Sequence, residues 1–538
     1  MKIWKTIIRL IFDALLILFA IVSILLFLLW KDTWDPYNNK IAENLIPTFT
    51  EHTLDTTHLF NGETSLPVRA SSLIDLDNDG IDEIFLGGWA WQPDQIFAYK
   101  NNNFIEISDS YNITKPDTLN SLAAGSVDMD NNWLSDLVVA REDGIYIYYN
   151  DWEKFSVEKP EININDTSTP LWLTFGDVNK DWFIDIFLST YIKKELMTGL
   201  TNFSPWYGST SALLLNNKGG GFENITVEAG IDYVHNTFQW IFVDINNDSW
   251  LDLVVAYDTG EPRIYKNKGD STFSLTQNPW TGKFAYPMGI WVGDYNNDGL
   301  TDLMFSNIGS SLPKALVKWD VKDTDDLVLE WFLLENKWDF IFEDVAEKAQ
   351  IQNYEFSWWA VMADMNNDAR EDLIVAENYV DLSFQKIFKL PGRFLLQRED
   401  WVFAATGKAS WVSNKAFGIT PLVSDFNNDG ALDLVWVNIA GPSFAFINDN
   451  NVVGNYLQIT LPETAQYLWA KVTVTTESGD IFVQDYITWE WLVADQSNTI
   501  HFGLGQTQAI TQLEIITVSG EPQIIENIEI NSRIVIQK

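Results

Sequence analysis

The chain has 538 residues, with 75 Asp and Glu against 34 Lys and Arg, and its formal net charge is −41. This acidic excess argues against nucleic acid or anionic lipid as a partner, because both repel a negative protein. The chain contains no cysteine, which excludes disulfides, a cysteine nucleophile and a zinc–thiolate site.

The N-terminal segment has the pattern of a membrane anchor. Lys2, Lys5 and Arg9 precede an apolar run that reaches residue 30. Basic residues before such a run place the N-terminus in the cytoplasm, and the run is long enough to span a bilayer. We expect residues 1–30 to be an uncleaved signal anchor with one transmembrane helix and the rest of the chain exported to the cell surface. A removed signal peptide is the alternative. Residues 31–65 are expected to be a spacer.

An acidic motif recurs seven times in residues 66–450, with oxygen-bearing side chains at positions 1, 3, 5 and 9 of each loop. Calcium takes six to eight oxygen ligands, so a tight loop that presents alternate carboxylates and amides suits it. The alternative is that these side chains only close turns through their own backbone. The predicted metal ligands are Asp75, Asp77, Asp79 and Glu83; Asp128, Asp130, Asn132 and Asp136; Asp177, Asn179, Asp181 and Asp185; Asp244, Asn246, Asp248 and Asp252; Asp294, Asn296, Asp298 and Asp302; Asp364, Asn366, Asp368 and Asp372; and Asp425, Asn427, Asp429 and Asp433.

The spacing of these loops predicts a repeated all-β architecture. The first aspartates of successive loops are 49 to 70 residues apart, and a short apolar run follows each loop. Such runs are typical of buried strands, and second motifs with Asn/Gly turns lie between them. Seven units suit a closed β-propeller, because closure removes exposed sheet edges. We therefore predict a seven-bladed β-propeller over residues 66–450.

Residues 455–538 lack the acidic motif and contain seven β-type runs. They predict a small C-terminal β domain, built as a sandwich or an open barrel.

The motifs resemble two known families. The seven loops are similar to FG-GAP/VCBS repeats, as in the integrin α-chain propeller, and this resemblance implies calcium bound in the loops. The tail looks like an ASPIC/UnbV domain in residues 501–505 (His-Phe-Gly-Leu-Gly), 519–520 (Ser-Gly) and 525–528 (Ile-Glu-Asn-Ile). Two departures stand out: residues 517–518 are Thr-Val where that family has Trp-Pro, and position 6 is not glycine in loops two, three, four and six.

Several tryptophans stand where glycine is expected. Trp133 and Trp182 occupy position 6 of loops two and three, where the sharp turn disfavours a bulky side chain. Trp338 takes the place that Gly269 has in an equivalent turn. We hypothesise that a UGA codon, written as Trp, is read as Gly in the organism; the alternative is a propeller that uses tryptophan for packing or sugar stacking. Other tryptophans in turn-like contexts are Trp359, Trp411, Trp469, Trp489 and Trp491.

The sequence favours a binding protein over an enzyme. The four histidines, His52, His58, His235 and His501, fall in no metalloprotease or triad pattern, and no phosphate-binding loop is present. We predict no catalytic residues and a membrane-anchored calcium-binding propeller that serves adhesion or binds protein or carbohydrate. The alternatives are a lyase or hydrolase that acts on extracellular polysaccharide, or a scaffold for surface assembly.

Overall fold

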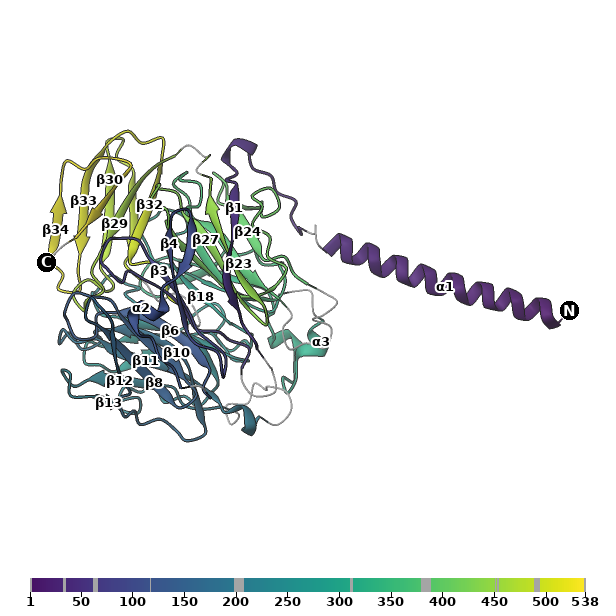
Figure 1. Ribbon diagram of the computed structural model, residues 1–538, viewed down its shortest axis with the longest axis horizontal. Coiled ribbons are helices and arrows are strands. Elements are labelled where there is room, and N and C mark those ends of the chain that lie inside the picture. The colour runs from purple at the N-terminus through teal and green to yellow at the C-terminus, as the bar shows by residue number, and fades with distance from the viewer. Residues whose placement is uncertain are drawn as a thin grey trace.

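The computed structural model describes residues 2–31, 35–60, 66–116, 118–197, 208–309, 313–378, 389–449, 451, 454–487 and 494–536 (Figure 1). The fold is all-β apart from helix α1 (Lys2–Lys31) and short helical turns. These turns are η1 (Glu43–Leu45), α2 (Ser108–Tyr111), η2 (Lys194–Leu196), α3 (Lys314–Val317) and η3 (Thr324–Asp326).

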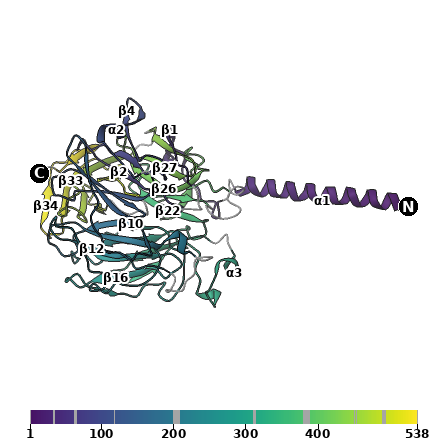
Figure 2. The same cartoon turned by 60° about the horizontal axis from the view of Figure 1, so that its bottom comes forward.

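Helix α1 stands apart from the β-sheet body in both views (Figures 1 and 2). It occupies the segment expected to be a signal anchor, and apolar side chains such as Ile11, Phe12 and Phe19 are exposed along it. Over the described part of the chain, however, no helix combines the length and the apolar character that a membrane span needs. The predicted helix is present, and its predicted passage through a membrane remains a proposal.

Seven four-stranded antiparallel sheets form the main body of the described chain. In six of them all four strands are consecutive in the sequence and pair side by side, and the seventh combines three consecutive strands with one from the start of the body. The first three sheets contain β2 (Ser71–Ile74), β3 (Glu83–Leu86), β4 (Gln95–Lys100) and β5 (Asn103–Glu106); β6 (Ser121–Val127), β7 (Asp136–Arg141), β8 (Gly144–Asn150) and β9 (Phe155–Glu158); and β10 (Ser168–Gly176), β11 (Asp185–Ile192), β12 (Ala212–Asn216) and β13 (Phe222–Asn224).

The next three sheets follow the same plan. They contain β14 (Thr237–Val243), β15 (Asp252–Tyr257), β16 (Arg263–Asn267) and β17 (Phe273–Leu275); β18 (Ile290–Gly293), β19 (Asp302–Phe305), β20 (Phe332–Asn336) and β21 (Phe342–Asp344); and β22 (Ser357–Ala363), β23 (Asp372–Glu377), β24 (Arg393–Gln397) and β25 (Phe403–Ala405). The chain between β19 and β21 also contains α3 and η3, which lie before the outer hairpin of the fifth sheet.

The seventh sheet is completed by a strand from the start of the body. β26 (Phe417–Ser424), β27 (Asp433–Ile439) and β28 (Pro442–Asn448) pair in sequence, and β1 (Phe49–Thr57) adds to the edge of β28. This corrects our expectation for residues 31–65, because part of the expected spacer is a strand. The residues of β1 alternate between buried and exposed near its end, as in Leu54, Asp55 and Thr56, which is the pattern of an edge strand.

The sheets follow one another in a propeller-like ring. The first strand of each sheet contacts the first strand of the next, from β2 and β6 through to β22 and β26, and β1 of the last sheet contacts β5 of the first. Every residue of β3, β7, β15, β19, β23 and β27 is buried, as the apolar runs predicted.

The C-terminal domain has two sheets. One contains β32 (Thr499–Gly505), β29 (Asn455–Thr460) and β35 (Ser532–Val535); the other contains β31 (Ile481–Asp485), β30 (Lys471–Thr476), β33 (Ile510–Ile516) and β34 (Pro522–Ile525). The domain, yellow in Figures 1 and 2, lies on the side of the body away from α1.

Candidate metal centres

Each acidic loop joins the first strand of a sheet to the second. Its position 9 is the first residue of that second strand, as Asp136 is for β7 and Asp302 is for β19. One end of the loop is therefore fixed by a buried strand, and the same arrangement is repeated in all seven sheets.

The backbone of every loop enters the left-handed region twice. In the first loop, Asn78 at position 4 has φ 51° and Gly80 at position 6 has φ 83°. Asparagine and glycine tolerate this region better than other residues do, which explains why Asn recurs at position 4. Position 6 has φ between 66° and 85° in all seven loops, with Gly80, Trp133, Trp182, Ser249, Gly299, Ala369 and Gly430 in that place.

Backbone N–H groups hold the carboxylate at position 1. In the fifth loop, Asp294 accepts from the N–H of Asp298 at 3.0 Å and from that of Gly299 at 2.7 Å. The equivalent pair of bonds occurs in the other six loops at 2.7–3.1 Å. These bonds are those of a turn closed by its own Asp side chain, so by themselves they fit the simple turn interpretation.

The carboxylate at position 9 is held from two sides. Asp302 accepts from the N–H of Tyr295 at 3.3 Å and from that of Asn336, on β20, at 2.7 Å. In five further sheets, the backbone N–H of a residue on the third strand donates to the carboxylate at position 9 in the same way. These residues are Asn150, Asn216, Asn267, Gln397 and Asn448. We did not predict this role from the sequence, although an Asn that recurs at the end of a β-type run, before a turn, was its signal.

The loops bring several carboxylates together. Oxygen atoms of Asp75, Asp77 and Asp79 lie within 4.8 Å of one another, and so do those of Asp128, Asp130 and Asp136. Two like charges at this separation repel by roughly 3–4 kcal/mol at an effective dielectric constant of about 20. In the other five loops position 3 is an asparagine, which supplies an oxygen without the charge.

Burial makes the negative charge of these carboxylates costly. Loss of hydration is the first cause that raises the pKa of Asp302 to about 9, and the neighbouring loop aspartates raise it further. The pKa of Asp136, of Asp185 and of Asp252 rises to about 8 for the same reasons. A divalent cation among these oxygens would favour their charged form and so oppose the effect of burial.

Two oxygen atoms in the loops favour a metal over a simple turn. Oδ1 of Asn246, at position 3 of the fourth loop, is buried and has no hydrogen-bond partner among the described residues, and the same is true of Oδ1 of Asp368, at position 5 of the sixth. An unpartnered buried acceptor is costly, and a hard cation is the ligand that carbonyl and carboxylate oxygens prefer. The residues therefore fit calcium.

Basic side chains lie beside two of the loops, the sixth and the fourth. Nη2 of Arg370 lies 2.6 Å from Oδ2 of Asp368. In the fourth loop, Nζ of Lys266 lies 3.6 Å from Oδ2 of Asp248. These side chains compensate part of the loop charge, so the seven loops are not equivalent as cation sites.

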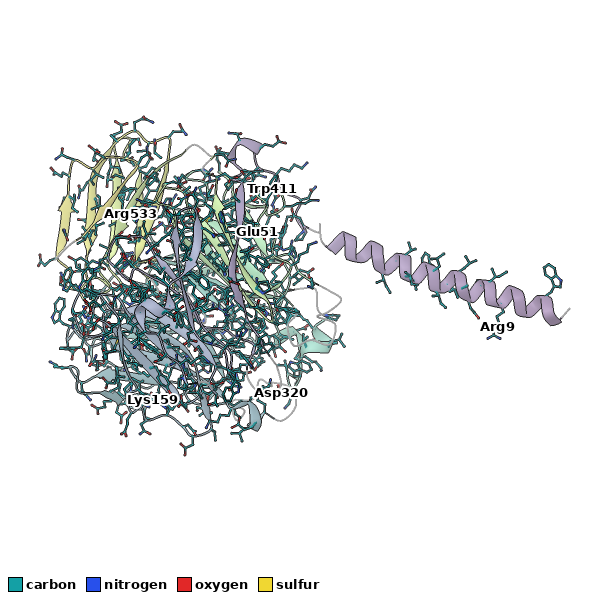
Figure 3. All side chains as sticks on the ribbon, viewed as in Figure 1. Arg9, Glu51, Lys159, Asp320, Trp411 and Arg533 are labelled. Atoms are coloured by element: carbon teal, nitrogen blue, oxygen red, sulfur yellow. The ribbon has the colours of Figure 1, made fainter. Side chains whose placement is uncertain are left out.

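The C-terminal domain packs directly on several of the loops, among them the first, sixth and seventh. Gln458 donates to Oδ2 of Asp425 at 2.9 Å, and His501 meets Oδ1 of Asn367 through Nε2 at 2.6 Å. Arg533, labelled in Figure 3, bonds to the carbonyl of Gly80. A Cβ atom at Gly503 would stand 1.7 Å from Oδ2 of Asp364, so this contact requires glycine. Two of these residues, His501 and Gly503, lie in the motif at residues 501–505 that resembles the ASPIC/UnbV pattern.

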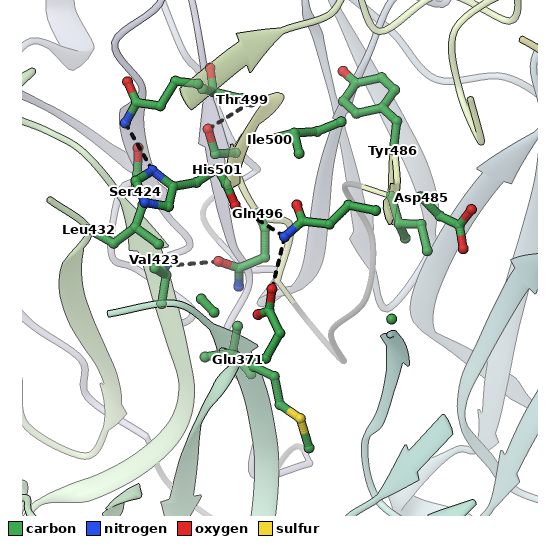
Figure 4. A pocket seen from close by; sticks show the side chains of 18 of the residues that line it. Glu371, Val423, Ser424, Leu432, Asp485, Tyr486, Gln496, Thr499, Ile500 and His501 are labelled. Carbon is green, nitrogen blue, oxygen red and sulfur yellow. Dashed lines mark hydrogen bonds between the residues drawn. The ribbon is translucent and has the colours of Figure 1, made fainter. Parts of the chain in front are cut away.

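A cavity of about 130 Å³ lies between this domain and the propeller-like ring (Figure 4). The polar groups that line it bond to protein: Glu371 accepts from Gln484 at 2.8 Å, and Gln496 accepts from the N–H of Val423 at 2.9 Å. Burial lowers the pKa of His501 to about 3, which keeps its ring neutral. The cavity is therefore a hydrogen-bonded domain interface. The other histidines lie on or next to β1 and before β14.

Family models match two parts of the chain. FG-GAP-like repeats match residues 128–188 and 244–305, and the ASPIC and UnbV model matches residues 465–538. The chain thus contains FG-GAP-like repeats and a C-terminal ASPIC/UnbV domain, as the resemblance implied.

Known proteins resemble the chain more distantly. Cartilage acidic protein 1 of Xenopus tropicalis is 22% identical over 314 residues, which cover 55% of this chain and 44% of that protein, so the match spans less than half of the relative. Among solved structures, an Agrocybe aegerita lectin that recognises non-reducing terminal N-acetylglucosamine is 14% identical, with 82% and 96% of the two chains covered and a TM-score of 0.37. The V. cholerae biofilm matrix protein Bap1 is 12% identical, with 90% and 62% covered and a TM-score of 0.32.

Proposed function

We propose that this chain is a seven-bladed, calcium-stabilised β-propeller, anchored to a membrane by α1, that acts outside the cytoplasm as a binding or adhesion module. The observation that carries the proposal is the sevenfold repetition of one loop, with the same left-handed turns and the same pinned carboxylates. Turns that served only as connections would not need four oxygen-bearing side chains at fixed positions.

The proposed blades are the seven four-stranded sheets. Their first strands contact one another in order, and β1 links the last sheet to the first. Pairing of an N-terminal strand with a C-terminal sheet joins the two ends of the ring, so that neither end leaves an open sheet edge.

Calcium would have a structural role in this propeller. Positions 1, 3, 5 and 9 of each loop would hold the ion, which would neutralise the clustered carboxylates and fix the turn between two buried strands. Extracellular modules of this kind bind calcium weakly, with Kd around 10⁻⁴–10⁻³ M. The basic side chains of Arg370, Lys266 and Arg533 would lower the calcium affinity of the sixth, fourth and seventh loops in this proposal.

The arrangement of α1 and the C-terminal domain supports an orientation relative to the membrane. The two lie on different sides of the body in both views. With α1 in the bilayer, the C-terminal domain would face away from the membrane, where it could meet a protein or carbohydrate ligand. The net charge of −41 disfavours nucleic acid as that ligand.

One experiment separates this function from its alternatives. The full chain in detergent is applied, with calcium and with chelator, to immobilised glycans and to extracellular protein extracts. A binding module retains a ligand unchanged, and calcium strengthens the retention. A polysaccharide lyase or hydrolase would release shorter products with time, and a scaffold would instead copurify a fixed set of membrane proteins. Either of these results would contradict the proposed function.

A further inference from the structure

Nine tryptophans of the described chain have left-handed backbones. This region is rarely occupied by bulky residues, and outside glycine it favours Asn, Asp and His. An excess of tryptophan there has no conformational reason. The nine are Trp91, Trp133, Trp152, Trp182, Trp319, Trp338, Trp401, Trp411 and Trp469, with φ between 40° and 95°.

The side chains of most of these residues are exposed, so burial contributes little to their stability. Trp91 is 74% exposed and Trp411, at the surface in Figure 3, is 73% exposed. Trp152, Trp182, Trp319 and Trp338 are also exposed, whereas Trp133, Trp401 and Trp469 are covered to different degrees. Several tryptophans outside the left-handed region are, by contrast, fully buried, as Trp331 is. The exposed indoles therefore combine a strained backbone with little packing.

Glycine occupies the equivalent place in other repeats. Position 6 of the acidic loops is Gly80, Gly299 and Gly430, with φ of 81° to 85°, and Trp133 and Trp182 hold that position with φ of 76° and 71°. The N–H of position 6 donates to the carboxylate at position 1 in each case. The backbone conformation and its hydrogen bond are therefore the same whether the residue is Gly or Trp.

The same substitution recurs in an unrelated turn. In the hairpin after β16, Gly269 has φ 80° and its N–H donates to Oδ1 of Asn267 at 2.9 Å. In the hairpin after β20, Trp338 has φ 95° and its N–H donates to Oδ1 of Asn336 at 2.9 Å. The hairpin after β8 places Trp152 in this role, with a bond of 3.0 Å to Asn150.

We infer that the residues at these nine positions are glycines in the natural protein, because its gene has UGA codons there that the organism reads as glycine. One reassigned codon explains why Trp occurs nine times in this region, whereas other large residues, such as Lys180, Lys218 and Phe340, occur there only once or twice per residue type. Four of the nine positions were not indicated by the sequence; these are Trp91, Trp152, Trp319 and Trp401. Trp359, which the sequence did indicate, lies in β22 without a left-handed backbone and is not included. Trp489 and Trp491 lie outside the described residues.

Glycine at these positions changes the candidate metal centres. With glycine at positions 133 and 182, five of the seven loops have glycine at position 6, and Ser249 and Ala369 remain the two exceptions. It also removes exposed indoles, such as those of Trp91 and Trp411, as a surface on which sugars could stack.

Peptide mass spectrometry of the protein from its own cells tests the inference, together with the codons of the gene. We expect UGA codons and peptides lighter by the mass difference between Trp and Gly at positions 133, 182 and 338. The peptide that contains Trp358 is the control, because this residue has no left-handed backbone and its indole donates to Asn378 at 3.0 Å. UGG codons, or peptides with Trp at 133 or 182, would overturn the inference.

Variants give a second test that does not need the native cells. In protein made with Trp at every position, we expect Trp133→Gly and Trp182→Gly each to raise Tm, because glycine adopts the left-handed turn without strain. Trp358→Gly is expected to lower Tm, because it empties a buried site. A fall in Tm for the two loop variants, like that of the control, would count against the inference.

Discussion

Nη2 of Arg533 lies 3.7 Å from Oδ2 of Asp425, and the same guanidinium donates through Nη1 to the carbonyl of Gly80. Arg533 belongs to β35 of the C-terminal domain, whereas Asp425 and Gly80 belong to the seventh and first acidic loops. One side chain thus joins the two sheets that meet where the ring closes.

Replacement of Arg533 by Ala is expected to lower stability. The side chain is largely buried, and a hydrogen bond to a charged group contributes about 1.5–3 kcal/mol. We expect a loss of that order in denaturant unfolding, with earlier release of the C-terminal domain by protease. Arg398→Ala is the control, because Arg398 pairs with Asp400 at the surface, where such pairs contribute about 0–1 kcal/mol. Equal effects of the two variants would contradict the role of Arg533.

Asp77→Asn should weaken the first loop as a calcium site. Asp77 is exposed and forms part of the cluster with Asp75 and Asp79. The affinity of such loops depends on how many charged ligands they have, so we expect a loss of about tenfold, or about 1.4 kcal/mol, in calorimetric titration. The calcium-free variant should be slightly more stable than the parent, because one repulsion is gone.

Asp109→Asn removes the same charge from an exposed position on α2, outside the loops. It should leave calcium binding unchanged. If both variants lowered the affinity alike, the effect would come from the overall charge of the protein and not from the loop.

The repeat pattern allowed much of this fold to be predicted. Position 9 of each loop begins a buried strand, as the apolar run after Asp136 indicated, and the Asn/Gly turns after β12 and β16 form hairpins. The role of β1 was missed because an edge strand pairs on one side only, and residues 49–57 have a weak apolar alternation. Arg533 could not be assigned from the sequence, because its partners are distant in the chain and only tertiary packing brings them together; the recurrence of Asn before the turns was a signal for the role of Asn336 that we did not use.

Truncation tests the role of β1. Deletion of residues 2–31 should leave Tm unchanged, because α1 stands apart from the body, and it should move the protein from the membrane fraction to the soluble fraction. Deletion that continues to residue 57 removes the strand paired with β28 and should lower Tm strongly. Membrane fractionation and calorimetry measure the two effects. A protein that lost β1 without loss of Tm would contradict its place in the seventh sheet.

Asp258 is expected to make stability depend on pH. Burial raises its pKa to about 6 from 3.8, although the hydroxyl of Tyr191, 2.5 Å from Oδ2, opposes the shift. The folded state therefore holds this proton more tightly than the unfolded state does. The stabilisation is complete below about pH 4 and is lost as the pH rises through 6, by at most about 3 kcal/mol.

Asp258→Asn removes the titrating group and keeps an acceptor for Tyr191. The difference in Tm, variant minus parent, should rise between pH 4 and pH 7 and then stay constant. Asp55→Asn, exposed on β1, is the control and should show no such rise. A difference for Asp258→Asn that did not depend on pH would contradict the account of its burial.

Thermal unfolding of the full chain in detergent, with calcium and with chelator at matched ionic strength, tests the central claim most directly. A ligand that binds only the folded state stabilises it by about 1.4 kcal/mol per site at ten times its Kd, and several loops would add their effects. We expect calcium at millimolar concentration to raise Tm by many degrees, magnesium to raise it far less, and the rise to shrink in Asp77→Asn. Equal Tm values with calcium and with chelator would mean that the loops are turns without a metal and would contradict the proposed calcium sites.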